Sequence, residues 1–336
     1  FTVLTSGVED GQLITLTLAA TTYTASVTNN TASIILPAIV LQALSAGTIS
    51  YSLDVKDAAG QAANSFSGSF TYDAILPIVA ITMSDTALKI GDTSLVTFTF
   101  SETPIGFAEG DITAANGDIT SLQVDGSNPN VYTATFTPTS DITNASNNIS
   151  VSTAYSDAAG NTGVGNESDN FTIDTGAPSV SSVAITSASG AANGYLNAGD
   201  VVSVTVEMDE ATFVTGTPTI ELNIGGIPKN ASYLSGSGST ALVFTYTIEA
   251  GLTDADGISI GQDKIALNSG TLRDAAGNDA TLAHSSVAAN SSYGVDTTAP
   301  TVTITMSDTA LIAGETATVT FTFSETPIGF AEGDIT

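Results

Sequence analysis

A short acidic motif recurs in this chain, and its residue types are those that bind metal ions. It reads KDAAG at 56–60, SDAAGN at 156–161 and RDAAGN at 273–278. The alanines and glycine allow a tight turn whose backbone carbonyls can join the Asp carboxylate, and the Asn can add an amide oxygen. The motif is therefore a candidate metal-binding loop. The alternative is a plain turn in which Asp and Asn satisfy nearby backbone groups.

Composition narrows the choice of cation. The 336 residues include 34 Asp and Glu against 5 Lys and Arg, a formal charge of −29, with one His and no Cys. Zinc sites use His or Cys, whereas Ca²⁺ accepts irregular sets of carboxylate and carbonyl oxygens. Nucleic acid and acidic membranes would be repelled at long range. We therefore expect Ca²⁺ as a ligand, no nucleic-acid partner, and no membrane insertion, since no apolar run reaches membrane-spanning length.

The periodicity of the sequence predicts β-strands nearly everywhere. Apolar residues alternate with Thr or Ser over 94–102, 131–139, 201–210 and 241–250, and Gly, Asn, Asp and Ser fill the segments between them. Only 36–47 has the pattern of a short helix. The sequence therefore predicts an all-β fold of tandem immunoglobulin-like antiparallel β-sandwich domains in a linear array.

Internal repetition predicts the domain boundaries. Residues 79–113 return almost unchanged at 302–336, and the segments YDAILP, IDTGAP and VDTTAP each place an acid shortly before a proline. The predicted domains are 1–76, 77–176, a larger one at 177–298, and a fragment at 299–336. The first lacks an opening strand and the last has only its opening strands. Either the chain is a piece of a longer one, or another copy completes these domains by strand addition.

This fold would bring distant acids together. In an immunoglobulin-like sandwich the entry to the first strand, the loop after the second strand and the loop before the last strand lie at one pole. We therefore expect Asp73 of the linker, Glu102 and Asp157 to converge and to hold a cation. The same reasoning gives further candidate ligands at the motif copies and junctions: Asp57, Asn161, Asp174, Asp209 (as a substitute or supplement for Glu210), Glu210, Asp274, Asn278, Asp296 and Glu325.

Two other features have less specific patterns. Asp254 and Asp256 in TDADGISI resemble the opening of a calcium loop, but the closing Glu of an EF-hand is missing, so an acidic turn is an equal alternative. The single His284 has Ser285 beside it, without a nucleophile-elbow pattern. We expect a surface or strand-end histidine, and the sequence predicts no enzyme.

The repeats resemble a known family. DTTAPTVTITMSDTAL followed by ATVTFTFSETPIGF, and its copy in 77–176, are similar to bacterial Ig-like repeats of giant cell-surface adhesins exported by type I secretion, often called RTX or biofilm adhesins. DADGISIGQDKIALNSGTLRDAAGNDATL is similar to a repeat of a cyanobacterial swimming-associated surface protein. The chain departs from the pattern at YDAILP and at Gln61, which replaces the motif Asn.

The resemblance implies an extracellular, calcium-rigidified extender on the bacterial cell surface. Such a stalk holds a distal ligand-binding module away from the cell for adhesion and biofilm formation, and its partners are calcium ions and neighbouring repeats of the same chain. The alternative is a fibre-forming or glycan-binding surface protein that associates with other copies through edge strands.

Overall fold

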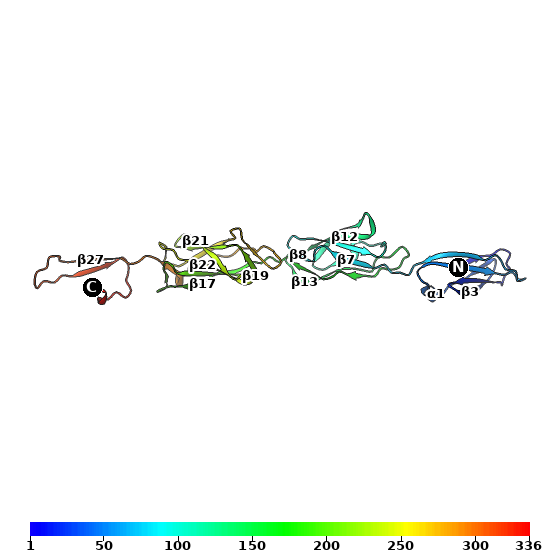
Figure 1. Ribbon diagram of the computed structural model, residues 1–336, viewed down its shortest axis with the longest axis horizontal. Coiled ribbons are helices and arrows are strands. Elements are labelled where there is room, and N and C mark those ends of the chain that lie inside the picture. Colours follow the sequence, from blue (N-terminus) through cyan, green and yellow to red (C-terminus); the bar gives the residue numbers. More distant parts are fainter. The chain divides into compact units, whose positions relative to one another are not determined.

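The chain forms β-sheets almost throughout. A computed structural model describes residues 1–336, whose ribbon consists mainly of strands (Figure 1). The chain falls into two compact units, Phe1–Asp174 and Thr175–Thr336. None of its helices has the length and apolar character that crossing a bilayer requires. The predicted all-β class is confirmed.

The first 76 residues contain two sheets, of which the larger has the strand order β3-β2-β5-β6 and the smaller pairs β1 with β4 (Figure 1). A short helix lies in the segment whose pattern indicated one. The elements are β1 (Thr2–Leu4), β2 (Leu13–Leu18), β3 (Thr21–Ser26), β4 (Thr31–Ser33), α1 (Ala38–Gln42), β5 (Gly47–Val55) and β6 (Phe66–Tyr72). The alternating Leu and Thr of β2 place Ile14, Leu16 and Leu18 in the core.

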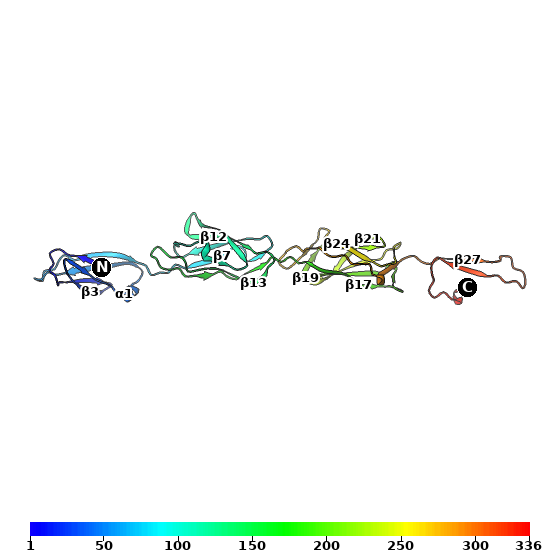
Figure 2. The ribbon, with the colours of Figure 1, turned by 180° about the vertical axis from the view of Figure 1, so that it is seen from behind.

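The rest of the first unit is a sandwich of a four-stranded sheet, β11-β12-β9-β7, and two three-stranded sheets, β13-β16-β8 and β10-β14-β15 (Figure 2). The elements are β7 (Val79–Met83), β8 (Ala87–Lys89), β9 (Ser94–Phe100), η1 (Glu109–Asp111), β10 (Ile112–Ala114), β11 (Gly117–Asp125), β12 (Asn128–Pro138), β13 (Thr143–Asn147), β14 (Ile149–Val151), β15 (Asn166–Glu167) and β16 (Phe171–Asp174). Phe136 of β12 and Phe171 of β16 meet edge to face at 5.3 Å and join the two layers. Each fully buried Phe contributes about 2–3 kcal/mol.

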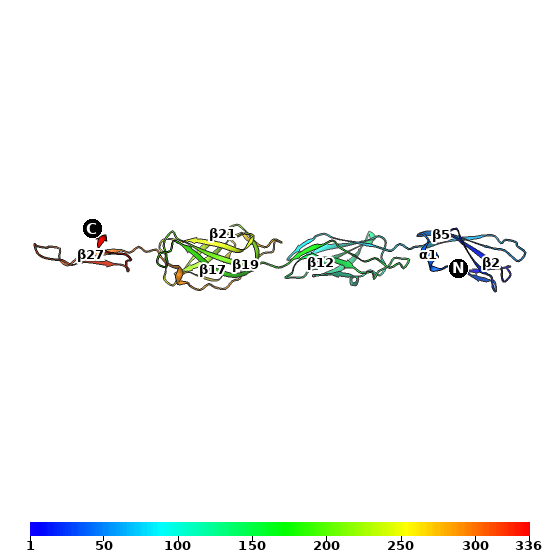
Figure 3. The same cartoon turned by 90° about the horizontal axis from the view of Figure 1, so that it is seen from below.

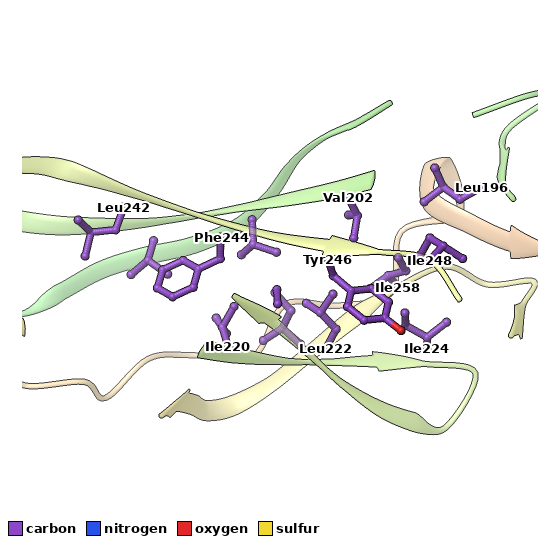
Figure 4. Close-up of a cluster of buried hydrophobic side chains, with 14 of the residues drawn as sticks. Leu196, Val202, Ile220, Leu222, Ile224, Leu242, Phe244, Tyr246, Ile248 and Ile258 are labelled. Atoms are coloured by element: carbon purple, nitrogen blue, oxygen red, sulfur yellow. The ribbon is translucent and has the colours of Figure 1, made fainter. Parts of the chain in front are cut away.

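The second unit contains a longer sandwich, built on a sheet of order β17-β19-β22-β21-β20-β24, with β25 paired to β19 and a small sheet β18-β26-β23 (Figure 3). The elements are β17 (Val180–Ser189), β18 (Tyr195–Leu196), β19 (Val201–Thr215), β20 (Thr219–Ile224), β21 (Ile227–Ser235), β22 (Ser239–Thr247), β23 (Thr253–Asp254), β24 (Ser259–Ala266), β25 (Thr271–Arg273), η2 (Ser291–Tyr293) and β26 (Gly294–Asp296). In Figure 4, Leu222, Phe244 and Tyr246 project into one apolar layer between these strands, and Phe244 is fully buried.

The last segment shows what the repeated sequence forms without the rest of a sandwich. It has β27 (Val302–Met306) paired with β28 (Val319–Phe323), followed by η3 (Glu332–Asp334). Val302 and Ile304 are 46% and 57% exposed, whereas their counterparts Val79 and Ile81 are 3% and 8% exposed. The sequence is nearly the same, so the difference comes from the strands that cover β7 and β9 in the first copy.

Each sheet lies within one of the four predicted domain ranges. Three buried apolar clusters follow the same division and lie in 1–76, 77–176 and 177–298. Independent folding of each range stays a prediction.

Candidate metal centre

At the start of the ranges 77–176, 177–298 and 299–336, the incoming segment is held against a neighbouring strand segment by hydrogen bonds to one residue. We call this arrangement the entry clasp. In the first copy Ser101 N–H donates to the carbonyl of Ile78 (2.9 Å), and Ile78 N–H donates to Ser101 Oγ (3.1 Å). Ser324 and Thr301 make the same two bonds, both at 2.9 Å. The clasp residue directly precedes a glutamate, so the glutamate lies beside the incoming linker.

Asp209 is the clasp residue of the 177–298 range. Its N–H donates to the carbonyl of Ser179 (2.9 Å), and its two carboxylate oxygens accept from Ser179 N–H (2.7 Å) and Oγ (2.6 Å). Burial acts to raise the pKa of Asp209, but these hydrogen bonds outweigh it and lower the pKa below its ordinary value. The carboxylate of Asp209 is therefore engaged in holding the entering strand, and Glu210 is the ligand candidate beside it.

The recurrent acidic motif forms the same closed loop in every copy. Asp157 N–H donates to the carbonyl of Asn161 (3.1 Å), and Asp157 Oδ1 accepts from the N–H groups of Ala159 (2.9 Å) and Asn161 (2.8 Å). Gly160 has φ +91°, a left-handed conformation that a side chain strains. The loop therefore fixes its aspartate before any ion is bound.

The motif asparagine ties this loop to the linker. Asn161 Nδ2 donates to Asp157 Oδ2 (2.8 Å) and to the backbone carbonyl of Asp73 (3.3 Å). In the second unit Asn278 Nδ2 donates to Asp274 Oδ2 (2.7 Å) and to the carbonyl of Gly176 (3.0 Å). The amide nitrogen, rather than the oxygen expected from the sequence, thus faces the aspartate and the linker.

Asp73, Glu102 and Asp157 form one carboxylate cluster. Each offers an oxygen, and the three oxygens lie within 4.8 Å of one another. Asp157 is only 2% exposed, while Asp73 and Glu102 are partly buried. The linker, the segment just after β9 and the loop before β15 and β16 supply one acid each, so side chains separated by up to 84 positions meet at the entrance of the sandwich.

The pKa of Glu102 indicates that the negative charge of the cluster is not compensated. Burial raises the pKa of Glu102, and the neighbouring carboxylates of Asp157 and Asp73 raise it further. Burial also acts to raise the pKa of Asp157, but hydrogen bonds from Asn161, Ala159 and Gly160 outweigh it and hold that pKa below its ordinary value. Asp157 is therefore stabilised as an anion by its own loop, whereas no hydrogen bond does this for Glu102.

The other predicted ligands have the following positions. Asp274 and Asn278 are buried, at 4% and 3% exposure, and Glu210 is partly buried in the same unit. Asp174 ends the first unit, where Thr143 Oγ1 donates to its Oδ1 (2.9 Å). The set of Asp174, Glu210 and Asp274 stays a prediction.

At the remaining linker and in the first domain the acids make local turns. Asp57 Oδ1 accepts from Gln61 N–H (2.8 Å), and Asp296 Oδ1 accepts from Thr298 N–H (3.0 Å). Glu325 is exposed. These three positions stay predictions as ligands.

The TDADGISI segment is a structured turn. Asp254 is 5% exposed, and its two oxygens accept from Gly225 N–H (2.6 Å) and Gly257 N–H (2.9 Å). Asp256 is exposed. Asp254 therefore joins the β20–β21 hairpin to the β23 segment, and metal binding by Asp254 and Asp256 stays a prediction.

His284 is buried, at 7% exposure, so the expectation of a surface histidine is wrong. Its Nε2 accepts from Lys264 N–H (2.8 Å), and its Nδ1 lies 2.9 Å from the carbonyl of Ser285, to which the Nδ1–H tautomer donates. Both ring nitrogens bond to backbone groups, so the ring supports the loop and has no nucleophile as a partner.

The entry clasp was not found from the sequence. Its only signal is the identity of the residue before each glutamate, which is Ser101, Asp209 or Ser324. Serine and aspartate share an oxygen that accepts a backbone N–H, and this function becomes visible only when the entering strand lies alongside.

Comparison with known proteins identifies the repeat. Residues 73–173 and 296–336 match the family model of the bacterial Ig-like domain. These two segments are bacterial Ig-like repeats. The matches begin at the linker acids Asp73 and Asp296, and the first spans the whole carboxylate cluster.

No curated protein sequence matches the chain. Among solved structures, a 1.5-MDa bacterial ice-binding adhesin is 19% identical, with a TM-score of 0.36, and the match covers 88% of this chain and 90% of that one. The Escherichia coli adhesin FdeC is 17% identical, with a TM-score of 0.33 and 88% of each chain covered.

The donor set in this Ig-like repeat fits a calcium ion. It consists of carboxylate oxygens, and no sulfur or imidazole lies among them. Ca²⁺ takes six to eight oxygens, so three carboxylates form part of a shell that backbone carbonyls or water would complete. Asp73, Glu102 and Asp157 are the residues that would hold it.

Proposed function

We propose that this chain is a calcium-stiffened extender of a bacterial surface adhesin, without enzymatic activity. The observation that carries the proposal is the carboxylate cluster at the point where the linker enters the sandwich. The bacterial Ig-like match supports an extracellular, cell-surface location. In this role the chain holds a distal binding module away from the cell.

The proposed stiffening acts through the linker. Asp73 belongs to the linker, whereas Glu102 and Asp157 belong to the sandwich, so a cation shared among them adds a cross-link between the two. Without a cation the three like charges repel one another and disfavour this arrangement. The clasp at Ile78 and the amide of Asn161 position the linker for binding, and calcium supplies the positive charge that the cluster lacks.

The proposal extends to the other junctions. Asp174, Glu210 and Asp274 would form a second site, Asp296 and Glu325 part of a third, and Asp57 part of one in the first domain. The partners are then calcium ions and neighbouring repeats. Biofilm formation and type I export rest on the family resemblance alone.

Small-angle X-ray scattering of the full chain tests the proposal. In millimolar calcium we expect an extended particle of constant maximum dimension, and in EGTA a broader distribution of dimensions at the same mass. Glu102→Gln should reduce the calcium effect, and Glu109→Gln, which changes an exposed acid outside the cluster, should leave it unchanged. Identical scattering with and without calcium would overturn the proposal.

Association through edge strands is the alternative function. The edge strands β3 and β6 of the first sheet carry no charged residue, although charged side chains are a common protection of exposed edges. A fibre subunit would show a mass that rises with protein concentration in the same scattering experiment. A constant mass would exclude this alternative.

A further inference from the structure

In each of two sandwiches, a strand from the beginning of the domain pairs in parallel with a strand from its end. In 77–176, β8 pairs with β16 in parallel, with Ala87 opposite Thr172 and Leu88 opposite Ile173. In 177–298, β18 pairs with β26 in parallel, with Tyr195 opposite Gly294 and Leu196 opposite Val295. All other pairs of named strands in residues 1–336 are antiparallel.

These pairs lie where tension would enter and leave a sandwich. The linker leads through β7 to β8, and β16 leads directly to the next linker. Tension between the linkers acts first on β7, which pairs with β9, and then reaches β8 at its N-terminal end, while it reaches β16 directly at its C-terminal end. Because the strands are parallel, the two forces point in opposite directions along the strand axes. The hydrogen bonds, which cross between the strands, are then loaded together rather than one after another.

The interior of the contact protects these bonds from water. Leu88 and Ile173 are each 1% exposed, and in the second unit Leu196 is 0% and Val295 1% exposed. Thr172 N–H donates to the carbonyl of Thr86 (2.9 Å). Water competes poorly for a hydrogen bond beside buried apolar side chains, so these bonds keep their strength under load.

We propose that β8–β16 and β18–β26 are tension-bearing clamps that determine the force at which the two sandwiches unfold. This function goes beyond stiffening of the linkers by calcium, since it resides within each sandwich. A stalk between a cell and an attached surface is pulled along its chain, and the clamps resist that pull without a bound ion.

A matched pair of proline substitutions tests the proposal by single-molecule force spectroscopy on the full chain. Thr172→Pro removes the hydrogen bonds from Thr172 N–H (2.9 Å) and Thr172 Oγ1 (3.3 Å) to the carbonyl of Thr86, and Thr139→Pro removes the bond of 2.9 Å from Thr139 N–H to the carbonyl of Asn116. Both threonines are exposed, and only Thr172 lies in a clamp. Released lengths, at about 3.6 Å per residue, identify which range unfolds.

We expect the two variants to lose similar stability in denaturant. At a given force, Thr172→Pro should unfold the 77–176 range at least about fivefold faster than the parent chain, the factor expected for loss of one backbone hydrogen bond alone, and Thr139→Pro should change this rate much less. Equal effects of the two variants, or no effect of Thr172→Pro, would overturn the proposal. The comparison is made within one buffer, first with calcium and then with EGTA, so it does not depend on the metal site.

If Thr172→Pro does not fold, the proposal can be tested by pulling the otherwise unchanged chain in a second direction. The chain has no cysteine, so Thr139→Cys provides a unique attachment point. Pulling between the N-terminus and this cysteine does not load β16, and we expect the 77–176 range to unfold at a lower force than in end-to-end pulling. Equal forces in the two directions would contradict the clamp.

Discussion

Replacing Glu102 by Gln is the most direct test of the carboxylate cluster. The substitution keeps the size of the side chain and removes one carboxylate from the cluster. Nothing else is lost, because burial and two neighbouring carboxylates, and no hydrogen bond, act on the pKa of Glu102. In EGTA we therefore expect an unchanged or slightly higher melting temperature, since the variant relieves repulsion among like charges.

The calcium-dependent part of stability gives the magnitude. A ligand at 100 times its dissociation constant stabilises the folded state by about 2.7 kcal/mol. For a domain of roughly 100 residues, 1 kcal/mol corresponds to about 4–8 °C, so calcium should raise the melting temperature of the 77–176 range by about 10–20 °C. Glu102→Gln should abolish most of that rise at the same calcium concentration.

Differential scanning calorimetry in calcium and in EGTA measures both quantities, and Glu109→Gln serves as the control for loss of one negative charge. Asp157→Ala is a poorer test, because Asp157 also accepts hydrogen bonds from Ala159 and Asn161, and we expect it to lower stability in EGTA as well. If Glu102→Gln lowered the melting temperature equally in calcium and in EGTA, the acid would have a structural role and the argument for a metal site would fail.

Three further predictions follow from the same contacts. The pKa of Glu102 is raised above its ordinary value of 4.5, so ionisation of Glu102 disfavours the calcium-free fold as the pH rises above 4.5. Below the raised pKa, protons compete with calcium for the carboxylate. The calcium-induced rise in melting temperature should therefore be smaller at pH 5 than at pH 7.5, and an equal rise would contradict the cluster. Asn161→Ala removes the bond from the loop to the linker and should weaken calcium binding, measured by isothermal titration, even though the carboxylates remain; unchanged affinity would show that this bond does not position the linker. Asp209→Ala should destabilise the second unit by about 1–2 kcal/mol in denaturant, whereas Asp209→Ser should retain most of the stability, because serine performs this role at Ser101; equal losses would contradict the clasp.

The sequence was most informative about strands that are buried on one face. The alternation over 94–102 and 201–210 depends only on which residues avoid water, and it predicted β9 and the first ten residues of β19. It could not predict β8. Residues Ala87–Lys89 form a strand where β16 pairs with them, whereas the corresponding residues 310–312 of the second copy form none. A short strand of this kind is defined by its partner rather than by its own residues.

The sequence likewise predicted one part of the candidate site and not another. Asp73, Glu102 and Asp157 were predicted together because an immunoglobulin-like sandwich brings their segments to one pole. The donor and acceptor of each contact were not predictable: the Asn161 amide presents its nitrogen to the aspartate, and Asp209 uses both oxygens on Ser179. A sequence gives the type of a polar group, but its partner depends on distances of a few tenths of an ångström.

The order of the ligands along the chain has a consequence for how the site forms. Asp73 precedes the sandwich in the linker and Glu102 lies in the first third of the range 77–176, whereas Asp157 follows β14 and is fixed by a loop near the domain's end. In the second copy, β27 and β28 pair, Glu325 is exposed, and Val302 and Ile304 of β27 are open to solvent. In the first copy the cluster needs the acidic loop as well as the paired opening strands, because Asp157 lies on that loop. A cation held there selects the complete sandwich over partly folded forms, so its binding energy contributes to the stability of the finished domain rather than to its nucleation.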